Sequence, residues 1–197
     1  MSTRIEIELY HTCRDEKRES IPQLAPFKAR DNGKQWLGVG YYFWVESQSL
    51  AKIWGASPAY SKQGYLVLKY QLGINQDDLL DLVGSPNDQE SFKKLMNEFK
   101  KQLGTANAKI TVAACVNWLQ KRQVWEWLAV KLADYGKVDK LSSRAIPVAG
   151  GDVTFLQPRI QLCLYAKPID TNTTLEYQGI VDSGKGKTSI FSGYKKR

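Results

Sequence analysis

The feature that most constrains the fold of this chain is a strand followed by a glycine-bracketed aromatic run. Residues 4–10 alternate polar and apolar side chains, which predicts a strand with one buried face, and His11, the only histidine, closes it. The tight segment Gly38-Val39-Gly40 then leads into the aromatic run 41–43. Because alternate side chains of a strand face opposite ways, Tyr42 is expected on one face and its two neighbours on the other.

Further helical and extended patterns follow this opening. Residues 47–54 predict a short helix, and its apolar face would carry Leu50, Ala51, Ile53 and Trp54. The first third of the chain thus alternates strand and short helix, and later strands are predicted at 145–148 and 160–166.

The middle of the chain, residues 86–145, is predicted to be helical. Ser85 is a candidate N-cap, with proline in the first turn, and apolar residues then recur every three or four positions up to Gly104. A second helix is predicted from 105 or 106 to 121. A third apolar run, 124–133, is assigned to a helix as well.

The order of these elements favours one α+β domain that spans residues 1–197. Strand, helix, strand, helices and strands in succession give a largely antiparallel sheet with a helical insertion in the middle. The chain length suits one ordinary domain, and neither a repeat nor a clear linker divides it. The basic carboxy-terminal stretch, residues 183–197, is a candidate for a mobile tail.

The charge and the apolar content of the chain indicate which partners and which cellular compartment to expect. Its 28 basic and 20 acidic residues give a net charge of +8, which favours an anionic partner such as a nucleic acid or a pyrophosphate. No apolar run approaches the ~20 residues that cross a bilayer. The charged amino terminus lacks the apolar core of a signal peptide. Three scattered cysteines suit free thiols. We therefore expect a cytoplasmic protein without a membrane contact, and leaderless secretion stays open.

Two of these segments form a recognisable pair. They are Tyr10-His11-Thr12 and the run 38–43, after which Ala51 and Trp54 follow in the predicted helix. The pair resembles the first two motifs of the ADP-ribosyltransferase family, which usually read Tyr-His-Gly-Thr and Gly-x-Gly-x-Tyr-Phe. A strand and a leucine-rich turn often come next in that family, and residues 65–70 and 79–82 look like them. The relevant branch is the histidine–tyrosine–third-residue branch, which includes the poly(ADP-ribose) polymerases and many bacterial toxins.

The third motif of that family lies on a late strand, where many members carry glutamate. Residues 158–164 are the best candidate here, and they place Gln161 at that position. The resemblance covers roughly residues 1–80 and this late strand, while residues 86–145 match nothing in the family. It implies a split antiparallel sheet that binds NAD⁺ in a cleft.

The resemblance also implies a role for each residue of the first two motifs. His11 would hydrogen-bond the adenosine ribose and anchor the cofactor, and Tyr42 would stack on nicotinamide. Gly40 would let the backbone approach the cofactor closely. Thr12 and Ser47 would assist near the nicotinamide amide.

Gln161 would hold the ribose 2′-hydroxyl through its amide oxygen. The reaction passes through a transition state with oxocarbenium character, which a glutamate stabilises with its charge and a glutamine does not. Glutamine also cannot take a proton from an attacking hydroxyl. Three possibilities stay open: an acceptor that is nucleophilic without help, a displaced carboxylate such as Glu126 or Asp152, or a weak or inactive enzyme. A structural place for Gln161 on an open strand face is the plain alternative.

The predicted function is therefore mono-ADP-ribosyl transfer from NAD⁺, a glycosyltransferase reaction, to a protein or a nucleic acid. A small basic transferase of this kind looks like a bacterial toxin of a toxin–antitoxin or phage-defence system, and a neutralising antitoxin partner is then expected. Two alternatives stay open: a catalytically decayed module that binds nucleic acid on the same fold, and an NAD glycohydrolase. A metal site is not expected from one histidine and three scattered cysteines.

Overall fold

A computed structural model describes most of the chain. The described residues are 2–16, 18–33, 35–60, 62–104, 110–134, 145–147, 153–155, 158–167 and 173–185.

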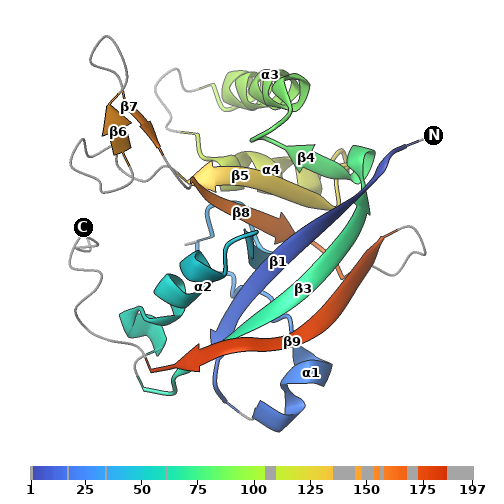
Figure 1. Ribbon diagram of the computed structural model, residues 1–197. Helices are drawn as coiled ribbons and strands as arrows, with labels where there is room; N and C mark the ends of the chain where they lie inside the picture. The colour runs from blue at the N-terminus through green and yellow to red at the C-terminus, as the bar shows by residue number, and fades with distance from the viewer. Residues whose placement is uncertain are drawn as a thin grey trace.

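A mixed seven-stranded sheet organises the molecule (Figure 1). In spatial order it runs β4-β5-β8-β2-β1-β3-β9, and every neighbouring pair is antiparallel except β4 and β5. The strands are β1 (Arg4–Arg14), β2 (Tyr41–Val45), β3 (Tyr65–Asn75), β4 (Leu79–Asp81), β5 (Ala129–Asp134), β8 (Arg159–Leu164) and β9 (Thr174–Gly184). A separate antiparallel pair joins β6 (Ala145–Pro147) and β7 (Val153–Phe155). The predicted α+β class and its largely antiparallel sheet are confirmed.

Four α-helices and three 3-10 turns connect these strands within the described residues. They are η1 (Arg18–Ser20), α1 (Ile21–Leu24), α2 (Gln48–Gly55), η2 (Pro58–Tyr60), η3 (Gln76–Asp78), α3 (Pro86–Gln102) and α4 (Val112–Lys121). The predicted start of α3 is confirmed, because Ser85 accepts a hydrogen bond from the Asp88 backbone N–H. None of these helices combines the length and apolar character that a bilayer crossing requires.

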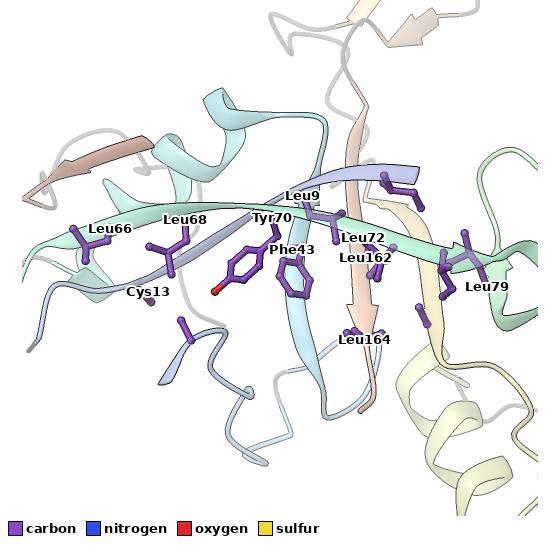
Figure 2. Packing of buried hydrophobic residues seen from close by; sticks show 14 of the residues in the cluster. Leu9, Cys13, Phe43, Leu66, Leu68, Tyr70, Leu72, Leu79, Leu162 and Leu164 are labelled. Carbon is purple, nitrogen blue, oxygen red and sulfur yellow. The ribbon is translucent and has the colours of Figure 1, made fainter. Parts of the chain in front are cut away.

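The two faces of the sheet carry different cores. We call one the α1 face, because Ile21 and Ala25 pack there against leucines of β1, β3 and β8. Figure 2 shows these leucines. We call the other the helical face. There α2 packs against Tyr10 and Trp44, and α3 and α4 pack against β4, β5 and β8. Each fully buried leucine contributes roughly 1.5–3 kcal/mol relative to an exposed one.

Two junctions in the sheet are irregular. β1 pairs with β3 along its whole length, but with β2 only at Leu9↔Val45 and Tyr10↔Trp44. β9 pairs with β3 with two register shifts, so that Gln178 and Val181 have no partner in the ladder. These are the positions of β-bulges, where one strand carries an extra residue.

Several predicted element boundaries are wrong. The first strand does not close at His11 but continues to Arg14. The run 124–133 is not a helix, because residues 124–128 are irregular and β5 follows. In β5, Ala129 packs on the α1 face and Val130 on the helical face. A strand that is covered on both faces has a continuous apolar sequence, which periodicity alone cannot separate from a buried helix.

Other differences lie at the edges of the predicted elements. In α2, Leu50 and Ala51 are buried as expected, but Ile53 and Trp54 are 44% and 46% exposed. Residues 183–184 of the expected tail belong to β9, and residues 186–197 lie outside the described part. The second helix was predicted to begin at 105 or 106, but α4 begins at Val112, because Thr111 caps it by accepting from the Ala114 N–H. Residues 105–109 lie outside the described part.

Candidate functional site

The three strands that carry the predicted site residues are direct neighbours. Their order is β8-β2-β1, although β8 follows β2 by more than one hundred residues in the sequence. Tyr10 lies opposite Trp44, and Trp44 lies opposite Gln161, so the three form one row across the sheet. The fold therefore brings the first, second and third motif segments into one region.

Within this region, Tyr42 and Gln161 share the helical face. Tyr42 lies opposite Cys163 in the β2–β8 ladder, one step from the row of Trp44 and Gln161. Cys163 packs in the cluster with α3 and α4, and Trp44 packs in the cluster with α2. This part of the helical face thus lies between the two groups of helices.

His11 points to the opposite face. Its ring contacts Phe43 and Phe27, with centroids 5.6 Å and 6.3 Å away, and it is 6% exposed. Phe43 belongs to the α1-face core, whereas Tyr42 packs in the cluster on the helical face. The predicted alternation of the aromatic run is confirmed, and it separates the rings of His11 and Tyr42.

Both ring nitrogens of His11 are held by the chain itself. Nδ1 lies 2.8 Å from the Tyr42 carbonyl oxygen, and the Phe27 N–H donates to Nε2 at 3.2 Å. These partners fix the tautomer, with the proton on Nδ1. Burial lowers the pKa of His11 to about 4, and the hydrogen bond to Tyr42 opposes this only in part. His11 is therefore neutral, and its two hydrogen bonds connect β1 to β2 and to the segment that joins these strands.

The predicted grip of one cofactor by His11 and Tyr42 together does not fit this arrangement. The two rings lie on opposite faces, and neither nitrogen of His11 is available to a ligand in this conformation. Sequence reasoning placed both residues near strand ends, but the alternation between the two adjacent strands sets their faces. The hydrogen bonds of His11 thus serve the core, and they do not suit the role of cofactor anchor.

Tyr42 supports the glycine-rich turn that precedes it. Its hydroxyl accepts from the Leu37 N–H at 3.0 Å and donates to the Gly38 carbonyl at 2.7 Å. Burial raises the pKa of Tyr42 well above its ordinary value, so the hydroxyl stays protonated. Its ring is only partly buried, which leaves part of it on the surface of the helical face.

The two glycines of the turn have structural reasons of their own. Gly38 has a φ of +92°, a conformation that other residues rarely adopt. A Cβ on Gly40 would lie 2.5 Å from the Cys163 Sγ and 2.6 Å from the Leu164 carbonyl oxygen. Gly40 thus allows β8 to approach closely, whereas the resemblance implied an approach of the cofactor.

Gln161 is held by a tryptophan that sequence reasoning did not single out. The indole Nε1 of Trp36 donates to Oε1 of Gln161 at 2.7 Å. An indole nitrogen is only a donor, so this contact fixes which end of the amide is the oxygen. A lone tryptophan in a polar loop offers no sequence signal for such a role.

Thr12 and Ser47 both act at α2. The Thr12 hydroxyl donates to the Ala51 carbonyl at 2.9 Å, and Tyr60 donates to the Thr12 carbonyl at 3.4 Å. Ser47 is the N-cap of α2, and its Oγ accepts from the Leu50 N–H at 3.3 Å. Thr12 lies in β1 and Ser47 lies just after β2, and the interactions that they make position α2.

The displaced carboxylates find no support at the site. Glu126 is exposed in the irregular segment before β5 and not on a helix, while Gln161 pairs with Leu132 inside β5. Asp152 lies outside the described residues. In the described part of the chain, no group of histidine, cysteine, aspartate or glutamate side chains could hold a metal ion.

A charged network on the helical face was also missed. Tyr10 donates to Glu8 at 2.7 Å, and Lys69 pairs with Glu8 at 2.6 Å. The hydrogen bond from Lys69, more than any other contact, lowers the pKa of Glu8. Burial raises the pKa of Tyr10 to about 12. The charged alternation of the first strand was the available signal, because Glu8 and Tyr10 share a face.

Comparison of the chain with known protein families, with curated proteins and with solved structures found no match.

Proposed function

We propose that this chain is an NAD⁺-dependent mono-ADP-ribosyltransferase whose site lies on the helical face, around Tyr42, Trp44 and Gln161. One observation carries the proposal: three segments that resemble successive motifs of that family, far apart in sequence, lie on the adjacent strands β8, β2 and β1. The short contact between β1 and β2 also agrees with a split sheet. The family fold itself is part of this proposal.

The proposed chemistry follows from the residues on this face. Tyr42 offers partly exposed aromatic surface for nicotinamide, Trp44 is buried next to it, and Gln161 lies partly exposed in the row of Trp44. The bond between the nicotinamide nitrogen and the ribose C1′ breaks, the nitrogen keeps the electron pair, and an acceptor oxygen bonds to C1′. The acceptor's proton passes to solvent, because Gln161 cannot take it. Without a carboxylate beside the developing cation, we expect a slow enzyme.

The biological setting belongs to the same proposal. The net charge of +8 favours an anionic acceptor surface or nucleic acid, and it also favours the cofactor's pyrophosphate. A cytoplasmic toxin with a neutralising partner protein is the setting that the resemblance suggests. Identification of the acceptor requires transfer of labelled ADP-ribose to a defined macromolecule.

A second candidate is a nucleic-acid-binding module that has lost its catalytic function. Two observations favour it: His11 is enclosed in the core, and the acceptor oxygen of Gln161 already receives a hydrogen bond from Trp36. Both groups are then engaged in holding the fold. NAD⁺ hydrolysis, with water as acceptor, is a variant of the first candidate.

Release of nicotinamide distinguishes these candidates. The purified protein is incubated with NAD⁺, with and without RNA, and free nicotinamide is measured. We expect release that disappears in Tyr42→Ala and persists in Tyr41→Ala, because Tyr41 lies on the α1 face. Absence of release under all conditions, together with tight RNA binding, would refute the transferase and support the module.

A further inference from the structure

The amide of Gln161 has a fixed orientation. Its Oε1 accepts from the Trp36 indole at 2.7 Å, and an indole nitrogen has no lone pair to accept in return. A flipped amide would set two donors against each other and lose this bond. The Gln161 NH₂ group must therefore point away from Trp36.

That NH₂ group is unpaired among the residues that the structure describes. No hydrogen bond from the Gln161 nitrogen is found there, and the residue is partly exposed on the helical face. It lies in the row of Trp44 and beside the row of Tyr42. An unpaired donor on a partly buried aromatic surface costs little free energy as long as water can reach it. A ligand that accepts a hydrogen bond from this donor is bound more tightly.

We propose that Trp36 makes Gln161 a hydrogen-bond donor toward the ligand. The ligand group that Gln161 binds is then an acceptor oxygen and not a hydroxyl. Trp36 is then a positioning residue, and Gln161 is the residue that contacts the ligand. In a dinucleotide, acceptor oxygens of this kind occur on the pyrophosphate and on the nicotinamide carbonyl. The inference takes the location of the ligand from the proposed function, but it assigns Gln161 the opposite polarity from that of a ribose-binding glutamate.

The substitution Gln161→Glu tests this polarity. Glutamate keeps an oxygen for the Trp36 indole and replaces the NH₂ donor with a charged acceptor. We expect the dissociation constant for NAD⁺, measured by calorimetry, to rise about tenfold or more, because acceptor then faces acceptor. Equal or tighter binding by Gln161→Glu would show that the amide receives a ligand hydroxyl, and it would overturn the inference.

A second variant separates the role of Trp36 from that of the fold. Trp36→Phe keeps an aromatic ring but removes the N–H, so the Gln161 amide becomes free to turn. We expect its side-chain NH₂ signals in nitrogen-labelled protein, assigned by their loss in Gln161→Glu, to broaden or shift. Trp118→Phe removes another partly buried indole and is the matched control, with unchanged Gln161 signals. Unchanged signals in Trp36→Phe would contradict the positioning role.

Two probes make the result independent of the transferase. Inorganic pyrophosphate and 1-methylnicotinamide are titrated separately, and the probe that shifts the Gln161 NH₂ signals identifies the source of the acceptor oxygen. If wild-type protein does not bind NAD⁺ but one probe shifts these signals, the proposed function fails and the donor assignment stands. If NAD⁺ and both probes leave the signals unchanged, the donor assignment fails.

Discussion

At the scale of single residues, His11 is neutral because the core gives its charge no support. One nitrogen donates to the Tyr42 carbonyl, the other accepts from Phe27, and the ring lies between two phenylalanines. A protonated imidazole would set an N–H against the Phe27 N–H. The residue that suggested a cofactor site from its sequence context thus has an equally good reason to be in the core.

Stability should depend on pH through this histidine. Its folded pKa of about 4 lies below the ordinary value of 6.5, so the unfolded chain binds the proton more readily. The contribution of neutral His11 to the free energy of unfolding is complete above pH 6.5, and it is lost as the pH falls toward 4. At pH 5 the loss is roughly 2 kcal/mol, from about 1.4 kcal/mol per pH unit. Urea unfolding at pH 7 and pH 5 measures it.

The variant His11→Gln provides the control for this measurement, because its amide does not titrate. The loss of unfolding free energy between pH 7 and pH 5 should be smaller in the variant by that amount. Glu8 and Asp81 also have lowered pKa values, but carboxylates of this kind titrate at lower pH. An equal loss in both proteins would contradict the assignment of a buried neutral imidazole.

The neighbouring strand β8 leaves no room for a side chain at Gly40. A Cβ there would lie 2.6 Å from the Leu164 backbone oxygen, which cannot move without disturbing β8. We expect Gly40→Ala to reduce the free energy of unfolding by roughly 1–3 kcal/mol, the usual cost of overpacking. Chemical denaturation measures this, and an unchanged midpoint would argue against the close approach of the two segments.

At the scale of elements, the sequence predicts those whose apolar pattern has one interpretation. α3 has a proline, a capping serine and one apolar face, and its start is as expected. β5 was assigned to a helix because it is apolar on both faces. β9 was not predicted, although Leu175 and Tyr177 alternate with polar residues. Its bulges interrupt the period of two that would have indicated it.

The cap of α3 gives a prediction at this scale. Ser85 accepts from the Asp88 N–H, so Ser85→Ala leaves that donor without its partner. We expect a loss of about 1 kcal/mol in the free energy of unfolding. Ser91→Ala, at an exposed position inside the same helix, is the control and should be neutral or slightly stabilising. Similar losses in both variants would count against the capping role.

At the scale of the whole molecule, the candidate site depends on contacts that a single sequence does not encode locally. The motif residues could be named from spacing, but whether β1 and β2 face the same way depends on their register. Trp36 and Gln161 are separated by 125 positions, so nothing in either segment announces their hydrogen bond. The types of residue in the region were thus predictable, and their orientations were not.

The three cysteines report on both cores at once. Cys13 is buried on the α1 face, and Cys115 and Cys163 are buried on the helical face. Burial raises the pKa values of Cys13 and Cys163 to about 12 and that of Cys115 to about 11. We expect the three thiols not to react with a thiol reagent at pH 8 in the native protein. All three should react together when the protein unfolds in urea. Early reaction of Cys13 alone would show that α1 opens locally.

The bulges of β9 have a consequence for how the protein behaves in concentrated solution. A foreign strand that aligned with this outer edge would find its donors and acceptors out of step at Gln178 and again at Val181. Only short stretches of matched pairing are then available, too few to hold another sheet in place. The two bulges therefore limit the addition of further strands at β9, and they reduce the tendency of this edge strand to nucleate fibrils.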